Sequence, residues 1–246
     1  MTKLALFIIS LFDYFHKKKI LFFIKKNLKL NNIELFLDVG AHQGETISLF
    51  CKNFRIKKLI SFEASLKNFL VLETKKNVFS SKFPSTKILL ENLAIGSQND
   101  YVKIKEFEES SSNTLKDIDQ NSAYFKKKFR IFNFFKKDNF FKETNIKLVK
   151  FFDYLEKKNI ENIDFLKIDT EGSEFDILKG LDSKIKKVNI IYFEHHYDLM
   201  LKKEYKFTDI NDLLIRNNFR KVFKIKMPFR KVFEYIYINE KKINRN

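Results

Sequence analysis

The stretch LFLDVGAHQGETISLF, residues 35–50, determines the expected fold. Residues 35–37 form the short apolar run that is typical of a parallel strand covered on both faces. Asp38 ends this strand, and Gly40 and Gly44 follow where the backbone must turn sharply and a ligand approaches closely. The remaining residues continue with the spacing of a helix. A strand that leads into a helix in this way brings the strand end and the helix N-terminus together, so the segment predicts a small-molecule site.

The glycine spacing indicates which small molecule binds. A dinucleotide fingerprint needs three glycines, G-x-G-x-x-G, because a pyrophosphate lies on the helix N-terminus. Here the pattern is D-x-G-x-x-x-G, which resembles motif I of the class I S-adenosylmethionine-dependent methyltransferases. A carboxylate suits the cationic sulfonium and amino groups of S-adenosylmethionine and repels a pyrophosphate. The resemblance implies that Asp38, Gly40, Ala41 and Gly44 bind the cofactor; a glycine turn in an unrelated α/β protein is the alternative.

A second acid lies 25 residues after Asp38. Residues 58–63, KLISFE, read as another short strand that ends in Glu63. In nucleoside-binding doubly wound folds, an acid about 20 residues past the glycine turn binds the ribose hydroxyls. A carboxylate accepts hydrogen bonds from both hydroxyls at once. We therefore expect Glu63 to bind ribose, with an exposed loop glutamate as the alternative.

The most specific segment is IDFLKIDTEGSEFDILKG, residues 163–180. It predicts a buried strand that ends at Asp169, a turn at Glu171 and Gly172, and a helix from Ser173 onward. The order of strand, acid, turn and helix repeats that of residues 35–50. Both segments therefore place acids at the crevice of an open parallel sheet.

Four motifs together carry a resemblance to a known family. DVGAHQGE, FEAS, ENLAIGS and LKIDTEGSEFDILKG are similar to the successive motifs of the FkbM-family methyltransferases, over about residues 33–195. These are class I enzymes that typically methylate hydroxyls of sugars or polyketide-type molecules. The resemblance implies an α/β fold with a doubly wound, Rossmann-like, seven-stranded, mostly parallel sheet and a C-terminal antiparallel hairpin. It also implies S-adenosylmethionine as cofactor, Asn92 and Ala94 beside the adenine, and Asp169 in the cofactor site. One departure is Phe151-Phe152-Asp153, where the family commonly has a T/S-L-D element.

We expect one methyltransferase domain over residues 31–246, preceded by an amphipathic helical extension over residues 1–30. That extension either docks on the domain or lies at a membrane interface as a peripheral contact. A third strand is expected over residues 87–95. Residues 110–147 are expected to be a lid or insertion over the acceptor site, although no role follows for the Lys- and Phe-rich part at 119–142.

Composition gives weaker constraints. The formal net charge is +17, but only 6 of the 48 basic residues are arginine, which nucleic-acid recognition favours. The joint excess of Lys, Asn, Ile and Phe is what an A/T-rich coding sequence produces, so we expect no nucleic-acid partner. Cys51 is the single cysteine and excludes an internal disulfide. The default location is therefore the cytoplasm, with the inner face of the membrane left open, and the oligomeric state stays open too.

Methyl transfer to an alcohol needs an aligned acceptor and the removal of a proton. Glu171, Glu194 and His195 are the expected catalytic residues because they lie at strand ends or turns around one crevice. His195 is the natural base by its ordinary pKa, and a structural, hydrogen-bonded histidine is the alternative. Oxygen ligands from Asp169, Glu171 or Glu194 would suit Mg²⁺, which the sequence does not establish.

Three functions are consistent with these residues. The first is O-methylation of a hydroxyl on a sugar, glycan or related small molecule. The second is methylation of RNA or protein, which the positive charge favours and the shortage of arginine opposes. The third is a non-catalytic scaffold that retains the fold, which the intact cofactor motif disfavours.

Overall fold

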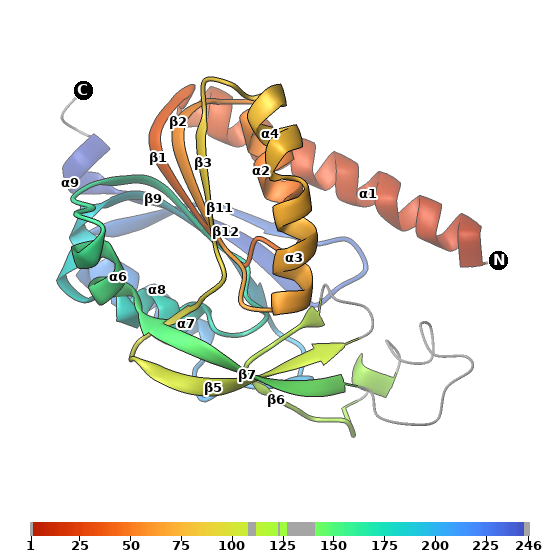
Figure 1. The fold of residues 1–246 in the computed structure, drawn as a ribbon. Helices are drawn as coiled ribbons and strands as arrows, with labels where there is room; N and C mark the ends of the chain where they lie inside the picture. Colours follow the sequence, from red (N-terminus) through yellow and green to blue (C-terminus); the bar gives the residue numbers. More distant parts are fainter. Residues whose placement is uncertain (1, 108–111, 123, 127–140, 244–246) are drawn as a thin grey trace.

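The computed structural model describes residues 2–107, 112–122, 124–126 and 141–243, and a seven-stranded sheet forms its centre (Figure 1). In chain order, the strands of this sheet are β1 (Asn32–Val39), β2 (Arg55–Phe62), β3 (Lys87–Glu91), β8 (Ile163–Ile168), β9 (Val188–His196), β11 (Phe219–Lys226) and β12 (Val232–Asn239). Their spatial order is β11-β12-β9-β8-β1-β2-β3. Five neighbouring strands run parallel, while β12 and β11 are antiparallel. The expected doubly wound fold with a C-terminal antiparallel hairpin is confirmed.

Helices cover both faces of the sheet (Figure 1). One face is covered by the C-terminal part of α1 (Thr2–Phe22), the π-helix η1 (Phe23–Asn27), α2 (Glu45–Cys51), α3 (Leu66–Thr74) and α4 (Lys76–Lys82). The other face is covered by α6 (Phe151–Lys157), α7 (Glu174–Gly180), the 3₁₀ helix η3 (Asp182–Lys187) and α8 (Phe207–Arg216), and α9 (Glu240–Ile243) follows the last strand.

The alternation of side chains along β1 explains why there is a hydrophobic core on each face of the sheet. Phe36 packs with the α2 side, and Leu35 and Leu37 pack with the α6 side. Because successive side chains of a strand point to opposite faces, a strand covered on both sides needs a continuous apolar run. The next side chain on the α2 side is Asp38, and its charge is therefore buried at the end of the strand.

A second, smaller sheet lies beyond the carboxyl ends of the central strands (Figure 1). It contains β4 (Ala94–Gly96), β7 (Phe141–Lys150) and β5 (Asp100–Phe107), in the order β4-β7-β5. The single strand expected over residues 87–95 is therefore wrong. The chain leaves the central sheet at Asn92, whose side-chain amide donates to the carbonyl oxygens of Glu63 and Ala64 at 2.8 and 3.3 Å, and it then pairs with β7.

Part of the expected lid, residues 110–147, contributes regular structure. Two-residue strands β6 (Asp117–Ile118) and β10 (Leu201–Lys202) pair with each other, and β7 begins within the segment. Residues 127–140, which include most of the Lys- and Phe-rich part, lie outside the described residues. The lid function itself stays a prediction.

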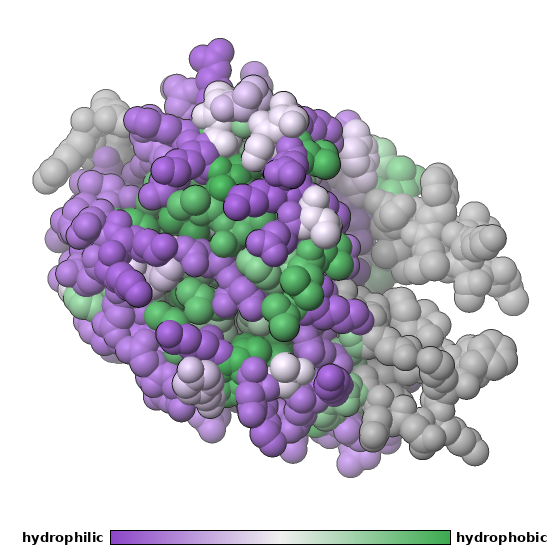
Figure 2. All heavy atoms as spheres, in the orientation of Figure 1, coloured by the Kyte–Doolittle hydropathy of each residue, from purple (hydrophilic) through white to green (hydrophobic). Residues whose placement is uncertain are grey.

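The C-terminal part of α1 and the π-helix after it pack on the central sheet. Ile20, Leu21 and Ile24 are buried in the core on the α2 side, and His16 contacts Glu234 of β12. Within the described part of the chain, no helix is both long and apolar enough to span a lipid bilayer. Figure 2 shows hydrophilic side chains over much of one face, with smaller hydrophobic groups between them.

Candidate functional site

The turn between β1 and α2 depends on two glycines. Gly40 has φ +88° and Gly44 has φ +89°, a left-handed conformation that L side chains rarely adopt. A Cβ atom on Gly40 would lie 1.9 Å from the carbonyl oxygen of Asp169. The backbone amide of Asp169 in turn donates to the carbonyl of Val39 at 2.9 Å. Gly40 therefore lets the ends of β1 and β8 approach closely.

Glu63 follows β2 and is held rigidly beside this turn. Its two carboxylate oxygens accept hydrogen bonds from the backbone amides of His42, at 2.7 Å, and Ser65, at 2.9 Å. Burial raises the pKa of Glu63 to about 7, although the two amide donors oppose this shift. These two hydrogen bonds leave other lone pairs of the carboxylate free to accept hydrogen bonds from ribose hydroxyls.

A pocket opens at the carboxyl ends of β1, β2 and β8. It brings together five residues that the sequence singled out: Gly40, Glu63, Ala94, Asp169 and Glu171. His42, which the sequence places in the cofactor turn, also lines it, and sequence reasoning missed the lining side chains of Asn68, Asn113, Thr114 and Ser173. Asn113 and Thr114 lie within the segment expected as a lid, and nothing in their local pattern places them at the strand ends.

Two side chains in this pocket present buried polar atoms without a hydrogen-bond partner in the described part of the chain. They are Oγ of Ser173 and Nδ2 of Asn113. Nearby, the Thr114 hydroxyl donates to the carbonyl of Glu171 at 2.7 Å, which ties residues 112–118 to the turn before α7. Because buried polar groups in proteins are normally paired, these two atoms fit contacts with a bound ligand.

Four further residues expected at the cofactor do not line the pocket. Ala41 is buried and its amide donates to the carbonyl of Phe62, while Gly44 packs against Phe79 and Leu72. Asn92 supports the backbone around Glu63, as described above. These three residues make structural contacts next to the pocket. The fourth residue that does not line it is Asp38.

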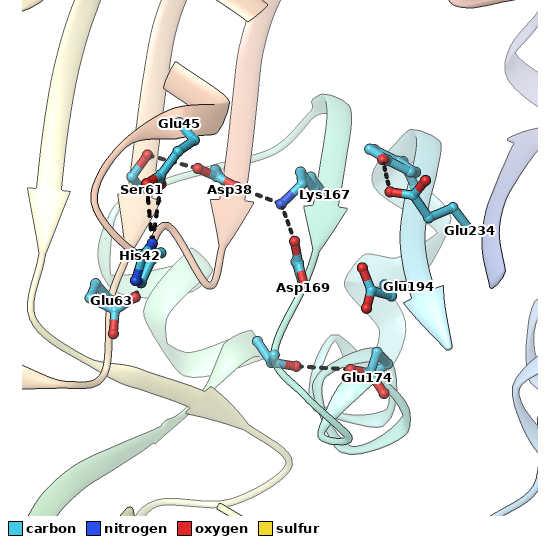
Figure 3. Close-up of polar contacts among 12 residues, drawn as sticks. Asp38, His42, Glu45, Ser61, Glu63, Lys167, Asp169, Glu174, Glu194 and Glu234 are labelled. Atoms are coloured by element: carbon cyan, nitrogen blue, oxygen red, sulfur yellow. Dashed lines mark hydrogen bonds and ion pairs between the residues drawn. The ribbon is translucent and has the colours of Figure 1, made fainter. Parts of the chain in front are cut away.

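Asp38 belongs to a buried charge network. Its Oδ1 lies 3.7 Å from Nζ of Lys167 on β8, and Nζ lies 2.9 Å from Oδ2 of Asp169 (Figure 3). Burial raises the pKa of Asp38 to about 6, although Lys167 opposes the shift. Burial would lower the pKa of Lys167, but the carboxylates of Asp169 and Asp38 raise it above its usual value. Lys167 therefore links Asp38, at the end of β1, to Asp169, at the end of β8.

A second polar cluster lies beside Asp169. His196 on β9 has its Nε2 atom 3.2 Å from Oε2 of Glu171 and 3.0 Å from Oε1 of Glu194. Its Nδ1 atom lies 3.1 Å from Oδ2 of Asp198. Burial would lower the pKa of His196, but the surrounding carboxylates, Glu171 first, raise it well above its usual value. Two of the three expected catalytic residues thus meet a histidine that sequence reasoning missed.

The structure places His195 away from this cluster, against the expectation. Its ring lies on the opposite face of β9, where ring centroids of Tyr197 and Phe207 are 4.8 and 5.7 Å away. Burial lowers its pKa to about 3, so the group is a poor proton acceptor near neutral pH. The period of two in a strand places Glu194 and His196 on one face, and this pattern could have indicated that His196 is the histidine beside Glu194.

The sequence matches one protein-family model, described as the methyltransferase FkbM domain, over residues 38–221. No curated protein matches the sequence.

Two solved structures with a similar fold are methyltransferases. One is a methyltransferase FkbM from Methylobacillus flagellatus KT, with a TM-score of 0.58 and 15% identity. The match covers 88% of this chain and 46% of that chain, so this chain spans less than half the length of that protein. Another is magnesium protoporphyrin IX methyltransferase from Synechocystis PCC 6803, with a TM-score of 0.51, 9% identity, and coverage of 94% and 82%. At such low sequence identities, the structural similarity shows a shared fold and nothing more.

Proposed function

This chain belongs to the FkbM methyltransferase family, and from that premise we propose that it methylates a hydroxyl oxygen of a sugar, glycan or related small molecule. The family makes it an S-adenosylmethionine-dependent enzyme of the class I fold. The acceptor class is the part that we propose.

The observation that carries the proposal is that one pocket is lined by two chemically different sets of residues. Glu63, Gly40 and Ala94 suit a nucleoside. The carboxylates of Asp169 and Glu171, which we call the acid end, line the same pocket. A nucleoside site and carboxylates in one pocket provide for cofactor and acceptor side by side.

The residues fit S-adenosylmethionine on three grounds. Glu63 presents a fixed carboxylate for the ribose, Gly40 leaves room at the backbone, and the buried Oγ of Ser173 and Nδ2 of Asn113 have no hydrogen-bond partner among the described residues. The Synechocystis relative was solved with this cofactor bound. When bound, S-adenosylmethionine would supply a methyl group on a positively charged sulfur, to which the acceptor oxygen would bond as S-adenosylhomocysteine leaves.

The acid end supports a hydroxyl as the acceptor. A sugar hydroxyl is a weak nucleophile at neutral pH and must lose its proton during transfer. The carboxylates of Asp169 and Glu171 line the pocket and are placed to take that proton. The side chains of Asn113, Thr114 and Ser173 offer the donors and acceptors that a molecule rich in hydroxyls needs.

The cofactor part is tested by calorimetric titration with S-adenosylmethionine and S-adenosylhomocysteine. We expect micromolar binding to the wild-type protein and a loss of at least tenfold in affinity for Glu63→Ala. The exposed Glu73→Ala on α3 is the matched control and should bind as the wild type does. If Glu63→Ala remains folded and binds with unchanged affinity, the ribose assignment is wrong.

The acceptor part is tested by transfer of a labelled methyl group from S-adenosylmethionine to three pools: sugars and glycans, RNA, and protein. Incorporation into the first pool supports the proposal. Incorporation into RNA or protein alone would overturn the acceptor class and leave the family assignment intact.

A further inference from the structure

The cluster of Glu171, Glu194 and His196 has the composition and spacing of a metal site. Each residue offers one ligand atom, and the three atoms all lie within 4.8 Å of one another. The Nε2 atom of His196 is 3.2 and 3.0 Å from the two carboxylate oxygens. Ligands about 2.0–2.2 Å from one ion are roughly 3.0–3.5 Å apart at bond angles of 90–110°, so these separations suit a shared ion.

The histidine is presented as a ligand. It is 6% exposed, and its Nε2 atom has no hydrogen-bond partner in the described part of the chain despite the two nearby oxygens. The carboxylate of Asp198 lies 3.1 Å from the opposite ring nitrogen, Nδ1. A carboxylate on the far nitrogen orients a metal-binding imidazole and fixes the tautomer that leaves Nε2 free to coordinate.

Charge around the cluster favours a cation. The carboxylates of Glu171, Glu194 and Asp198 all contact one imidazole. Figure 3 shows Asp169, at the end of the adjacent strand, beside Glu194. Lys167 is already shared between Asp38 and Asp169. Lys203, whose Nζ atom donates to the carbonyl oxygen of His196, balances part of this charge, and a bound cation would compensate the rest when all three carboxylates are ionised.

We infer that Glu171, Glu194 and His196 bind a divalent transition-metal ion at the acid end of the pocket. A nitrogen ligand favours an ion such as Mn²⁺ or Zn²⁺ over Mg²⁺, which prefers oxygen alone. Three protein ligands leave a coordination position open, as in catalytic metal sites. The site stands on its own geometry; its role, to polarise the acceptor hydroxyl, rests on the proposed function.

The test is calorimetric titration of untagged protein, freed of metal by a chelator, with Mn²⁺, Zn²⁺ and Mg²⁺. We expect micromolar or tighter binding of Mn²⁺ or Zn²⁺ and at least tenfold weaker binding of Mg²⁺. His196→Gln should lose at least tenfold in affinity. His195→Gln is the matched control, because it changes the neighbouring buried histidine on the opposite face, and it should bind as the wild type does.

A second variant keeps the test valid if His196→Gln fails to fold. Asp198→Asn keeps all three ligands, and loss of such an orienting carboxylate typically weakens metal binding about 10- to 100-fold. Absorption bands of Co²⁺ bound to the wild-type protein give an independent readout of nitrogen and oxygen ligands. The inference is wrong if the wild-type protein takes up none of Mn²⁺, Zn²⁺ and Co²⁺, or if folded His196→Gln and Asp198→Asn bind as the wild type does.

Titration with S-adenosylmethionine separates the two proposals. Cofactor binding and methyl transfer without metal uptake would overturn the metal site alone. Metal uptake without cofactor binding would overturn the proposed function and leave the metal site standing.

Discussion

His195 and His196 are adjacent in sequence, yet their imidazole rings lie on opposite faces of β9. The ring of His195 packs among Tyr197, Tyr205 and Phe207, whereas Nε2 of His196 lies 3.0 Å from the carboxylate of Glu194. Successive side chains of a strand point to opposite faces, so one histidine packs in the aromatic core and the next lies in the acidic cluster.

Replacing His195 with phenylalanine should leave cofactor affinity unchanged. The ring sits among aromatic side chains, and its buried Nδ1 atom has no partner in the described part of the chain. A swap of similar shape in such a place typically changes the free energy of unfolding by less than about 1.5 kcal/mol. Urea denaturation and calorimetry check this. A folded His195→Phe that loses cofactor binding would return His195 to the site.

Gly40→Ala should unfold more easily than the wild type. The left-handed backbone costs a non-glycine residue about 1–2 kcal/mol, and the new Cβ would overlap the carbonyl oxygen of Asp169. We expect a loss of about 2–5 kcal/mol in the free energy of unfolding, measured in urea. Gly96→Ala is the matched control, because its Cβ meets only the side chain of Leu148, which can move. Equal losses in both variants would contradict the close approach at Gly40.

Lys167→Met should be strongly destabilising because it leaves Asp38 buried without a countercharge. Breaking one side of a buried ion pair typically costs about 3–5 kcal/mol. Lys57→Met is the control, since its ion pair with Glu34 is exposed and should contribute nothing measurable. In the double variant Asp38→Asn, Lys167→Met, part of the lost stability should return. Strictly additive losses would show that Asp38 and Lys167 do not interact.

The stability of the protein should depend on pH through Glu63. Burial raises its pKa from 4.5 to about 7 in the folded state, so the folded protein binds the proton more tightly than the unfolded chain does. The stabilisation is fully present below about pH 4.5 and is lost as the pH rises through 7. A shift of this size corresponds to about 3 kcal/mol. Chemical denaturation between pH 4.5 and 8 should show a steeper decline for the wild type than for Glu63→Gln, and parallel curves would contradict the shift.

Ser173→Ala should separate binding from stability. The Ser173 hydroxyl is buried and has no hydrogen-bond partner within the ranges that the structure describes, so its removal should leave the free energy of unfolding unchanged or slightly higher. If the hydroxyl bonds a ligand, one neutral hydrogen bond of about 0.5–1.5 kcal/mol corresponds to a loss of roughly twofold to twelvefold in affinity. Calorimetry with S-adenosylmethionine measures that loss. A destabilised Ser173→Ala with unchanged affinity would show a structural hydroxyl.

Local sequence patterns predicted the central sheet well. The apolar runs before Asp38 and Asp169 are strands, and the alternating segments 219–226 and 232–239 form the antiparallel pair β11 and β12. The failure at residues 87–95 has a physical cause. Whether a strand stays in one sheet depends on its pairing partner, and β4 pairs with β7 more than 45 residues later in the chain.

The sequence by itself determined the strand, glycine and helix order around Gly40 and the acids at the strand ends, because side-chain period and backbone freedom are local properties. Only the tertiary structure decided which of those acids share a pocket and that Lys167 joins Asp38 to Asp169. It also placed His196, and not His195, beside Glu171 and Glu194. These choices depend on register between strands distant in sequence, where a shift of one residue moves a side chain to the other face of the sheet.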